Sequence, residues 1–570
     1  MNILGVHDGH NASAVLLVDG HVVAGAQEER FRNEKNYIGF PQNAINWVLK
    51  EHHLSVQDLD FVALASVHQP PAFDTKLIRD VFKKEQEQFT RSRLLGIGRD
   101  TPFYQIYRWR LRSERIREFR KAGFEERKLV FVEHHTCHAA ASYYGSPWRD
   151  RVLVLTLDGG GDRLSATVSI ASGSSIERIA STPDADSVGN IYARVTFMMG
   201  FSPWEHEYKI MGMAPYASQS HSATLKRQLD SYLDLSEKNP LTFRRKISEP
   251  TRLICRRLET PLRYQRFDQI ACALQSFTEE LVIRWVRAAI SETGIRKVAL
   301  GGGVFMNVKV NKLIAEIPEV ENVFVFPSCG DESNAVGAAY QAYVDEIGSA
   351  PTPLGPIYWG PGFGMTEAED AIKKVAQGNE FDYENIDGIE GAIVDLLLKG
   401  KVVARVDGSM EFGARALGNR SILADPSDLG NVQIINRMIK MRDFWMPFAP
   451  VVLAERQDEY FCRPKPIQSR YMMFAFDTQP ARRKEIIAAI HQADGTARPQ
   501  VIEKKYNPSY YAVLRGFEKA TGRAVLLNTS FNLHGYPIAL GPAEALWVFN
   551  NSGLEYLALG NYLLRKKNAR

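Results

Sequence analysis

Residues 130–162 constrain the fold of this chain more than any other segment. An apolar run at 130–132 leads into a helix-like segment with three histidines, and a second apolar run at 152–157 ends in the sequence Asp-Gly-Gly-Gly-Asp. Polar turns at the carboxyl ends of strands are where α/β proteins hold their ligands. The segment therefore predicts an α/β fold with a polar site at the end of its second strand.

The spacing of the histidines indicates a metal site. His134 and His138 are four residues apart, so on a helix they lie on one face and can share an ion. His135 is three residues from His138 and is also within reach. The alternative is a helix with surface histidines, and this segment alone does not decide between the two.

The glycine run that follows indicates phosphate binding. Backbone N–H groups at Gly159, Gly160 and Gly161 can approach phosphate oxygens because no Cβ is in the way. The carboxylates of Asp158 and Asp162, at the two ends of the run, can hold a metal or its water. The alternative is an ordinary glycine-rich turn.

Two more strand–turn–helix units strengthen the interpretation as a metal–nucleotide site. One strand, at 298–300, ends in three glycines and precedes a helix with two asparagines four residues apart; the other, at 323–326, is followed by Gly-Asp-Glu-Ser-Asn. Both units place polar groups at the carboxyl end of a strand. The residues concerned are Gly301, Gly302, Gly303, Asn307, Asn311 and Asp331.

The composition is that of an ordinary globular protein, and 570 residues exceed one hydrophobic core, so two or three domains are expected. The net charge of +4 is too small to predict nucleic-acid binding. The five cysteines are scattered without a CxxC spacing, which argues against a disulfide framework and a zinc knuckle. No apolar run is long enough to cross a membrane, and the chain opens on a strand-like segment rather than a signal peptide. We therefore expect a reduced, cytoplasmic setting.

The first residues predict a β-hairpin. Apolar runs at 3–6 and 13–18 flank a polar turn at 7–11, and a second turn at 19–20 leads to the apolar run 22–26. Actin-like ATPase folds begin with such a hairpin, whose first loop faces the nucleotide phosphates.

A charged helical insertion is expected at 74–128. Between residues 108 and 120 it carries six arginines interleaved with glutamates and aromatic residues. The pattern suits an anionic partner such as tRNA, or a solvated helix or dimer surface with i,i+4 ion pairs, and we favour the second interpretation.

A stretch rich in Pro and Gly separates two predicted domains. The first covers 1–350, residues 351–366 form a linker, and a second α/β domain covers 367–570. The second domain places cations at several turns, and guanidinium groups bind phosphate oxygens as a fork. A phosphate or oxyanion pocket is therefore expected there, with the candidates Arg415, Lys440, Arg442 and Arg498.

At these residues the chain resembles the ATP-dependent O-carbamoyltransferases, which include nodulation-factor and antibiotic-tailoring enzymes. The resemblance covers essentially the whole length and rests on the combination of VEHHTCHAAASYY, LDGGGD, YKIMGMAPYA, LGGGVFMNVKVN, EFGARALGNRSILADP, MPFAP, DGTARPQ and LLNTSFNLHGYPI. It implies an α/β chain with an N-terminal actin-like domain, similar to the tRNA threonylcarbamoyl transferase, and a C-terminal YrdC-like domain.

The resemblance also implies a two-step reaction. The C-terminal domain would convert carbamoyl phosphate and ATP, with Mg²⁺, into carbamoyl adenylate and pyrophosphate. A hydroxyl of a small natural product or saccharide would then attack the carbamoyl carbon in the N-terminal domain, and AMP would leave. A closed cationic pocket suits this chemistry, because carbamoyl phosphate decomposes in water. No stretch of the sequence identifies the acceptor.

The family's site residues map onto this chain one by one. Its metal ligands match His134, His138, Asp158 and Asp331, with iron(II) favoured and Mn(II) or Zn(II) also suited. Its nucleotide site matches Gly159, Gly160, Gly161, Asp162, Lys209, Gly301, Gly302, Gly303, Asn307 and Asn311. Its carbamoyl phosphate pocket matches Arg415, Lys440, Arg498, Asn528 and Ser530, to which we add Arg442; Arg415, Lys440, Arg498 and Ser530 are also expected to take part in catalysis. His10 is the expected general base for the acceptor hydroxyl, the alternative being a turn residue that only positions the substrate.

The chain departs from the family pattern at two positions. Asn11 stands where many members have Asp, and Met446 stands where the turn often has an arginine that binds phosphate. Arg442 could compensate for the second change. The other functions weighed are a tRNA-modifying threonylcarbamoyl transferase, with the arginine-rich stretch as its footprint, and an ATP-binding scaffold without transfer chemistry. The insertion and residues 217–265 are where we expect the acceptor pocket to be shaped, and the insertion could form a dimer contact.

Overall fold

The computed structural model describes residues 1–68, 74–87, 102–376 and 381–567. The chain divides into two compact units. Unit 1 comprises Met1–Glu28 and Asn36–Gly355, and unit 2 comprises Glu29–Lys35 and Pro356–Arg570. Within the described ranges, every helix is too short or too polar to span a bilayer.

The first sheet of unit 1 has the strand order β3-β2-β1-β4-β5. It opens as the expected hairpin, because β2 pairs antiparallel with both β1 and β3, and β4 and β5 then add parallel strands on the other side of β1. The strands are β1 Asn2–His7, β2 Ser13–Val18, β3 His21–Gln27, β4 Phe61–Ala65 and β5 Leu129–Val132.

The second sheet of unit 1 repeats this topology. Its order is β12-β11-β6-β7-β8, in which β6, β7 and β8 form an antiparallel meander and β11 and β12 run parallel to β6. The strands are β6 Val152–Gly161, β7 Leu164–Ser172, β8 Ser175–Pro183, β11 Lys297–Gly301 and β12 Asn322–Val325. Two sheets with the same order and directions form a duplicated, actin-like α/β fold, and the expected fold class is confirmed for this unit.

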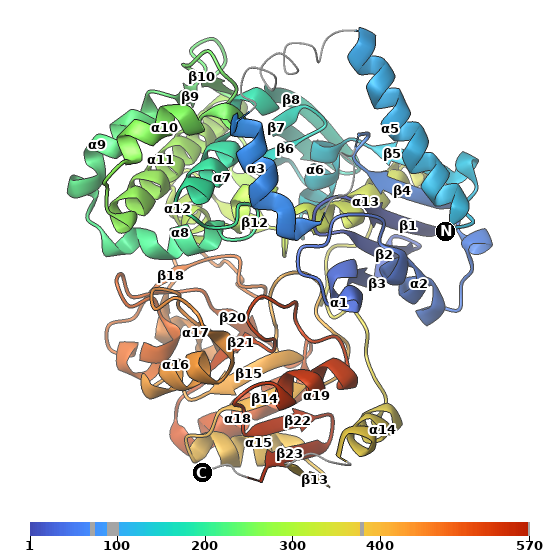
Figure 1. The fold of residues 1–570 in the computed structure, drawn as a ribbon, viewed down its shortest axis with the longest axis vertical. Helices are drawn as coiled ribbons and strands as arrows, with labels where there is room; N and C mark the ends of the chain where they lie inside the picture. Colours follow the sequence, from blue (N-terminus) through green and yellow to red (C-terminus); the bar gives the residue numbers. More distant parts are fainter. Residues whose placement is uncertain (69–73, 88–101, 377–380, 568–570) are drawn as a thin grey trace. The chain divides into compact units, whose positions relative to one another are not determined.

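Two helices lie between the sheets of unit 1 (Figure 1). α13 (Asn334–Ile347) packs on β1 and β4, α6 (His134–Gly145) packs on β6 and β11, and the two helices pack on each other. Their close approach depends on small residues. A Cβ at Gly337 would lie 1.9 Å from the carbonyl oxygen of Cys137, and one at Gly5 would lie 2.0 Å from that of Ala335.

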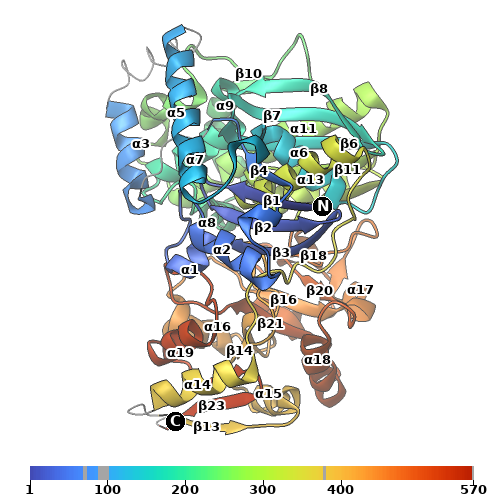
Figure 2. The same ribbon diagram turned by 90° about the vertical axis from the view of Figure 1, so that its right-hand side faces the viewer.

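The remaining elements of unit 1 include two helices of the insertion, α3 (Ile78–Glu87) and α5 (Pro102–Lys121), both labelled in Figure 2. The part of the expected insertion at 88–101 lies outside the described residues. Other elements are α2 Gln42–Glu51, α7 Val188–Met198, α8 Glu207–Met213, α9 Gln219–Asp230, β9 Leu233–Leu235, β10 Phe243–Arg245, α10 Cys255–Leu262, α11 Phe267–Thr293 and α12 Val308–Glu316.

Unit 2 is built on a mixed eight-stranded sheet of order β13-β23-β22-β14-β15-β21-β16-β20, with its hydrophobic core between the sheet and its helices. The strands are β13 Phe381–Asn385, β14 Val403–Val406, β15 Arg420–Ala424, β16 Ala449–Leu453, β20 Gln500–Ile502, β21 Val525–Ser530, β22 Tyr556–Leu559 and β23 Tyr562–Lys566. A second sheet has β17 Phe461–Cys462, β18 Phe476–Thr478 and β19 Thr496–Ala497. The helices are α14 Met365–Ala376, α15 Ile389–Leu398, α16 Gly430–Ile435, α17 Gln457–Tyr460, α18 Pro508–Thr521 and α19 Pro542–Asn550.

Two chain segments cross the boundaries expected from the sequence. Residues 29–35 belong to unit 2, and the first four of them lie in the short helix α1 (Glu28–Arg32). Within unit 2, Arg30 Nη2 donates a hydrogen bond to the carbonyl oxygen of Gly413 at 2.8 Å. The expected linker, 351–366, is divided at residue 355, and its later part is hydrogen-bonded through the backbone to 410–412. Unit 2 is therefore assembled from two separate stretches of the chain.

Candidate functional site

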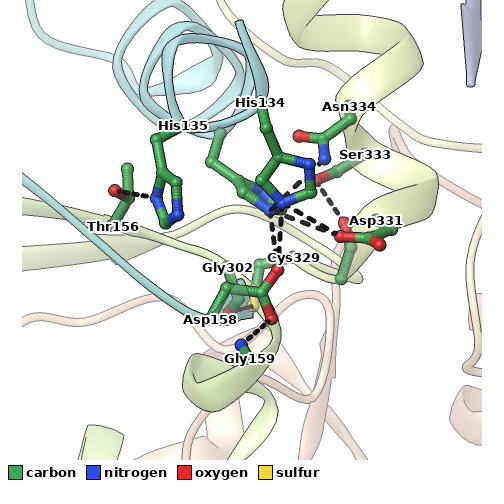
Figure 3. Close-up of polar contacts among 12 residues, drawn as sticks. His134, His135, Thr156, Asp158, Gly159, Gly302, Cys329, Asp331, Ser333 and Asn334 are labelled. Carbon is green, nitrogen blue, oxygen red and sulfur yellow. Dashed lines mark hydrogen bonds and ion pairs between the residues drawn. The ribbon is translucent and has the colours of Figure 1, made fainter. Parts of the chain in front are cut away.

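Four side chains from three parts of unit 1 converge at one point (Figure 3). The first turns of α6 carry His134 and His138 on one face, the end of β6 supplies Asp158, and the turn after β12 supplies Asp331. The turns after parallel strands lie at the same edge of the sheet, which is why residues so far apart in sequence meet. One donor atom from each side chain lies within 4.8 Å of the others.

The distances fit a single bound cation. His134 Nε2 lies 3.2 Å from His138 Nε2, 3.1 Å from Asp158 Oδ2 and 3.5 Å from Asp331 Oδ1. His138 Nε2 lies 3.4 Å and 3.5 Å from the same two carboxylate oxygens. Ligands about 2.1 Å from one ion are separated by roughly 3.0–3.4 Å. Two imidazoles and two carboxylates form a donor set suited to Fe(II), Mn(II) or Zn(II).

Neighbouring groups hold these ligands in orientation. Ser66 Oγ lies 3.0 Å from His134 Nδ1, and the backbone N–H of Gly159 donates to Asp158 Oδ1 at 2.7 Å. Burial lowers the pKa of His134, but the charges of Asp331 and Asp158 outweigh it and raise that pKa to about 9. The two carboxylates therefore strongly stabilise a positive charge at this point, either a proton on the imidazole or a metal ion.

His135 does not join the ligand group, although its spacing allowed it. Its Nδ1 lies 2.8 Å from Thr156 Oγ1, and burial lowers its pKa to about 3. The second histidine of the motif is thus a buried, neutral side chain facing β6 (Figure 3).

The glycines beside this cluster are required by packing. A Cβ at Gly161 would lie 2.1 Å from the ring of His134, and one at Gly301 would lie 2.3 Å from Ser142 Oγ. Gly302 has a φ of 101°, and a Cβ there would lie 2.4 Å from the carbonyl oxygen of Leu157. These glycines let β6, β11 and α6 approach closely, so their presence is explained before any ligand is considered.

Four other predicted nucleotide residues have structural partners in unit 1. Asp162 accepts from the backbone N–H groups of residues 67, 68 and 134. Asn307 caps α12 by accepting from the N–H groups of residues 309 and 310, and Asn311 donates to the carbonyl of Phe305 at 2.7 Å. Lys209 is buried on α8 with its Nζ 5.6 Å from the Phe201 ring centroid. Gly159, Gly160 and Gly303 complete the edge beside Asp158.

His10 is close to the metal-binding group through His7, the last residue of β1, whose Nε2 lies 3.8 Å from Asp331 Oδ2. His10 follows β1, forms a β-bridge with Ile38, and is half-buried. Its carbonyl oxygen lies 3.1 Å from His7 Nε2, and its ring centroid lies 5.7 Å from that of Trp204. The His10 ring thus lies beside Trp204, in the loop that follows a histidine close to Asp331.

Unit 2 brings its predicted cations together. Lys440 is buried, and its Nζ donates to Ser530 Oγ at 3.1 Å and to Asn532 Oδ1 at 2.6 Å. Burial lowers the pKa of Lys440 well below its usual value, and the positive charges of Arg442 and Lys35 lower it further. Lys440 therefore lies in a group of basic side chains.

Arg498 shares this environment. Burial lowers its pKa well below the usual value, and the charges of Arg415 and Arg442 add to the effect. Among the residues that the structure describes, neither Arg498 nor Lys440 has a carboxylate partner. Concentrated positive charge of this kind is the arrangement that binds a multiply charged anion.

Two neighbours of this cluster were missed by the sequence reasoning. Asn532 accepts from both Lys440 and Ser530, and the motif ending at 532 could have indicated it. Lys35 acts on Lys440 because residues 29–35 fold with unit 2, which no local pattern shows. The predicted residue Asn528 donates to the carbonyl of Ala416 and to Gln500 Oε1, both at 3.1 Å.

The arginine-rich helix α5 was expected to be a solvated helix or dimer surface with i,i+4 ion pairs, and Arg115 departs from this expectation. Arg110 is exposed and pairs with Glu114 at 2.8 Å, as a solvated helix predicts. Arg115 is 6% exposed and paired with Asp8 in the first loop, because α5 packs this side chain against the end of β4. Arg115 therefore belongs to the interior of unit 1.

Comparison with known proteins assigns the chain to a family. Residues 2–340 match the family described as "Carbamoyltransferase N-terminus", and residues 394–566 match "Carbamoyltransferase C-terminus". The chain is 32% identical over 570 residues to nodulation protein NolNO of Sinorhizobium fredii, covering 98% of this chain and 79% of that protein. It is 34% identical over 449 residues to nodulation protein NolO of Bradyrhizobium diazoefficiens, covering 77% and 79%. The chain belongs to the carbamoyltransferase family and is an enzyme of that class, as the resemblance implied.

Solved structures give more distant likenesses. Full-length HypF in its phosphate- and nucleotide-bound form is 13% identical, with a TM-score of 0.35, over 60% of this chain and 56% of that one. Component A of the (R)-2-hydroxyglutaryl-CoA dehydratase of Acidaminococcus fermentans is 15% identical, with a TM-score of 0.30, over 60% and 96%. The fold described above rests on its strand topology.

Proposed function

We propose that this carbamoyltransferase activates carbamoyl phosphate with ATP in unit 2 and transfers the carbamoyl group to an acceptor hydroxyl in unit 1. The observation that carries the proposal is the group of cations around Lys440 and Arg498. Burial, together with the charges of neighbouring arginines and Lys35, lowers the pKa of these two residues, and neither has a carboxylate partner in the described part of the chain. An enzyme that used only one nucleotide site would not need it. This assigns to unit 2 the YrdC-like role expected from the resemblance.

The balance of atoms sets the order of events in unit 2. Water must first replace phosphate on carbamoyl phosphate, giving carbamate and inorganic phosphate. A carbamate oxygen then attacks the α-phosphorus of ATP, and pyrophosphate leaves with carbamoyl adenylate as the product. Arg415, Arg442, Arg498 and Lys440 would hold the phosphate groups, and enclosure would protect the intermediate from water.

Unit 1 would complete the transfer. The acceptor hydroxyl attacks the carbamoyl carbon, its proton passes to a base, and AMP leaves with the C–O bond electrons. His10 is the proposed base, because it is half-buried at the loop after β1 and an imidazole titrates near neutral pH. His134, His138, Asp158 and Asp331 would hold a divalent metal, which supplies positive charge for the adenylate phosphate when bound.

An assay without acceptor tests the proposal. Wild-type protein with ATP, Mg²⁺ and carbamoyl phosphate is followed for the release of both phosphate and pyrophosphate. Arg498→Ala should reduce release on the order of 10²-fold, whereas Lys519→Ala, which removes an exposed cation from α18, should leave it unchanged. If the wild type releases no pyrophosphate with or without added acceptors, the two-step reaction is wrong and an ATP-binding scaffold becomes the better account.

A further inference from the structure

Trp204 has a backbone conformation that its side chain does not favour. Its φ of 65° lies in the left-handed region, which bulky L-residues rarely adopt. The backbone N–H of Trp204 donates to Glu207 Oε1 at 2.8 Å, so the start of α8 holds this conformation. Backbone strain at a large exposed residue points to a use for its side chain.

The Trp204 ring lies between the proposed base and the insertion. Its centroid is 5.7 Å from that of His10 and 5.5 Å from that of Phe82, in edge-to-face arrangements at 64° and 81°. The side chain nevertheless stays 41% exposed. An exposed aromatic surface thus lies immediately beside the half-buried imidazole.

The insertion helix α3 is fixed where it supports this ring. Phe82 is 2% exposed and lies under the guanidinium of Arg194, 3.9 Å from its centroid. Glu85 forms ion pairs with Arg194 and Arg252, and Arg79 donates to the carbonyl oxygen of Phe201. The position of Trp204 is therefore set by packing on two sides, as a preformed binding surface requires.

We propose that Trp204 is the platform on which the acceptor binds, and that the acceptor is a saccharide ring. This inference rests on the proposed function, because it takes His10 as the base for the acceptor hydroxyl. The face of an indole ring carries negative potential and attracts the positively polarised C–H groups of a pyranose face. A pyranose stacked on Trp204 would present its hydroxyls at its edge, within reach of the neighbouring imidazole. An open-chain alcohol has no such face to offer.

Binding without chemistry tests the platform independently of the reaction. Methyl pyranosides of glucose, galactose and mannose are offered to the full-length protein without ATP or carbamoyl phosphate, and contacts are measured by saturation-transfer NMR. Glycerol is the open-chain comparison. At least one pyranoside should bind, and Trp204→Ala should weaken that binding about tenfold or more. Trp204→Phe should recover part of the loss, and Phe82→Leu, which removes only the supporting ring, should cause a smaller loss.

Carbamoyl transfer then separates binding from a structural role. With labelled carbamoyl phosphate and ATP, Trp204→Ala should raise KM for the pyranoside with a much smaller change in kcat, and should leave KM for glycerol unaffected. A fall in kcat that is equal for both acceptors, with KM unchanged, would show that Trp204 only holds His10 and would overturn the proposal. Failure of every pyranoside to bind the wild type would also overturn it. Pyrophosphate release without acceptor reports on the proposed function alone, so the two failures are distinguishable.

Discussion

Arg115 donates two hydrogen bonds to Asp8, from Nε to Oδ2 at 2.6 Å and from Nη2 to Oδ1 at 2.7 Å, although the two residues are 107 positions apart. Both side chains are 6% exposed. The same guanidinium donates to the backbone carbonyls of Ala65 and Ser66. One arginine of the insertion therefore fixes the loop that carries His10 to the end of β4.

Removing this arginine should destabilise unit 1. Arg115→Met keeps most of the side-chain volume but leaves the Asp8 carboxylate buried without its partner, which costs about 3–5 kcal/mol. Urea unfolding measures the loss, and Asp8→Asn in the same protein should recover part of it. Arg110→Met on the same helix is the matched control, because its pair with Glu114 is exposed and should contribute little to stability. Equal effects of the two substitutions would contradict the assignment.

Lys35 should take part in anion binding by unit 2. Its charge acts on buried Lys440, so Lys35→Met removes attraction for the phosphate groups and should raise KM for carbamoyl phosphate or ATP about tenfold. Steady-state kinetics of phosphate and pyrophosphate release gives the values. Lys50→Met, which removes an exposed lysine from α2, should have no effect. Unchanged KM values for both substrates in Lys35→Met would show that the segment 29–35 is only structural.

Glu207 should make stability depend on pH. Burial raises its pKa to about 7, whereas a glutamate in the unfolded chain titrates near about 4.3. Between these values the folded state binds more protons than the unfolded state, so the free energy of unfolding falls as pH rises and stays low above pH 7. Glu207→Gln keeps an acceptor for the Trp204 N–H and should be more stable than wild type at pH 8, by about 1–3 kcal/mol.

Thermal unfolding at pH 4 and at pH 8 measures this difference. The advantage of Glu207→Gln should be nearly absent at pH 4, where the wild-type carboxyl is mostly protonated in both states. Glu205→Gln, at the neighbouring and half-buried position, serves as the comparison. A Glu207→Gln protein with the same advantage at both pH values would contradict the titration.

Met441 should be improvable by glycine. It caps the turn at 436–440 with a φ of 45°, and its side chain is 74% exposed. Met441→Gly removes the cost of the left-handed conformation and should raise stability by about 0.5–1 kcal/mol. Met441→Ala retains that cost and should give no gain. Thermal midpoints of the two variants decide, and a lower midpoint for the glycine variant than for wild type would refute the argument.

Metal content should distinguish the two neighbouring histidines. Purified protein loaded with Fe(II), Mn(II) or Zn(II) should hold about one ion per chain, and His138→Ala should lose it because one of four ligands is gone. His135→Ala should keep its ion, since that ring faces Thr156. Elemental analysis after gel filtration gives the ratio. Metal retained by His138→Ala and lost by His135→Ala would contradict the assignment of His138 as a ligand.

The sequence pattern could predict that His134 and His138 share a helix face and that polar turns follow neighbouring strands, whereas the set of four ligands came from the family resemblance. Asp158 lies near the end of β6 and Asp331 in the turn after β12. These strands run in the same direction in one sheet, so their carboxyl ends meet at a common edge. The hairpin at the N-terminus was predictable for a similar reason, since its turns are local. Periodicity and turn chemistry are properties of short segments, and short segments carried these predictions.

Other features depend on contacts between distant segments and could not be predicted. Arg115 looked like its solvated neighbours, and only the packing of α5 on β4 buries it. Lys35 stands in the N-terminal part of the sequence but folds with unit 2. The glycines at 161 and 302 are predicted to bind phosphate, and the structure adds a packing requirement at both positions that no local pattern shows. A local pattern shows which residues are available, and the tertiary fold decides their partners.

The segment Glu29–Lys35 makes unit 2 discontinuous in the sequence. It is synthesised before the rest of unit 2, so its place in that unit does not exist until residues beyond 356 have been made. During synthesis this segment therefore cannot reach its final fold before the later part of unit 2 has been made. For the same reason, splitting the gene at residue 355 would yield an incomplete second protein.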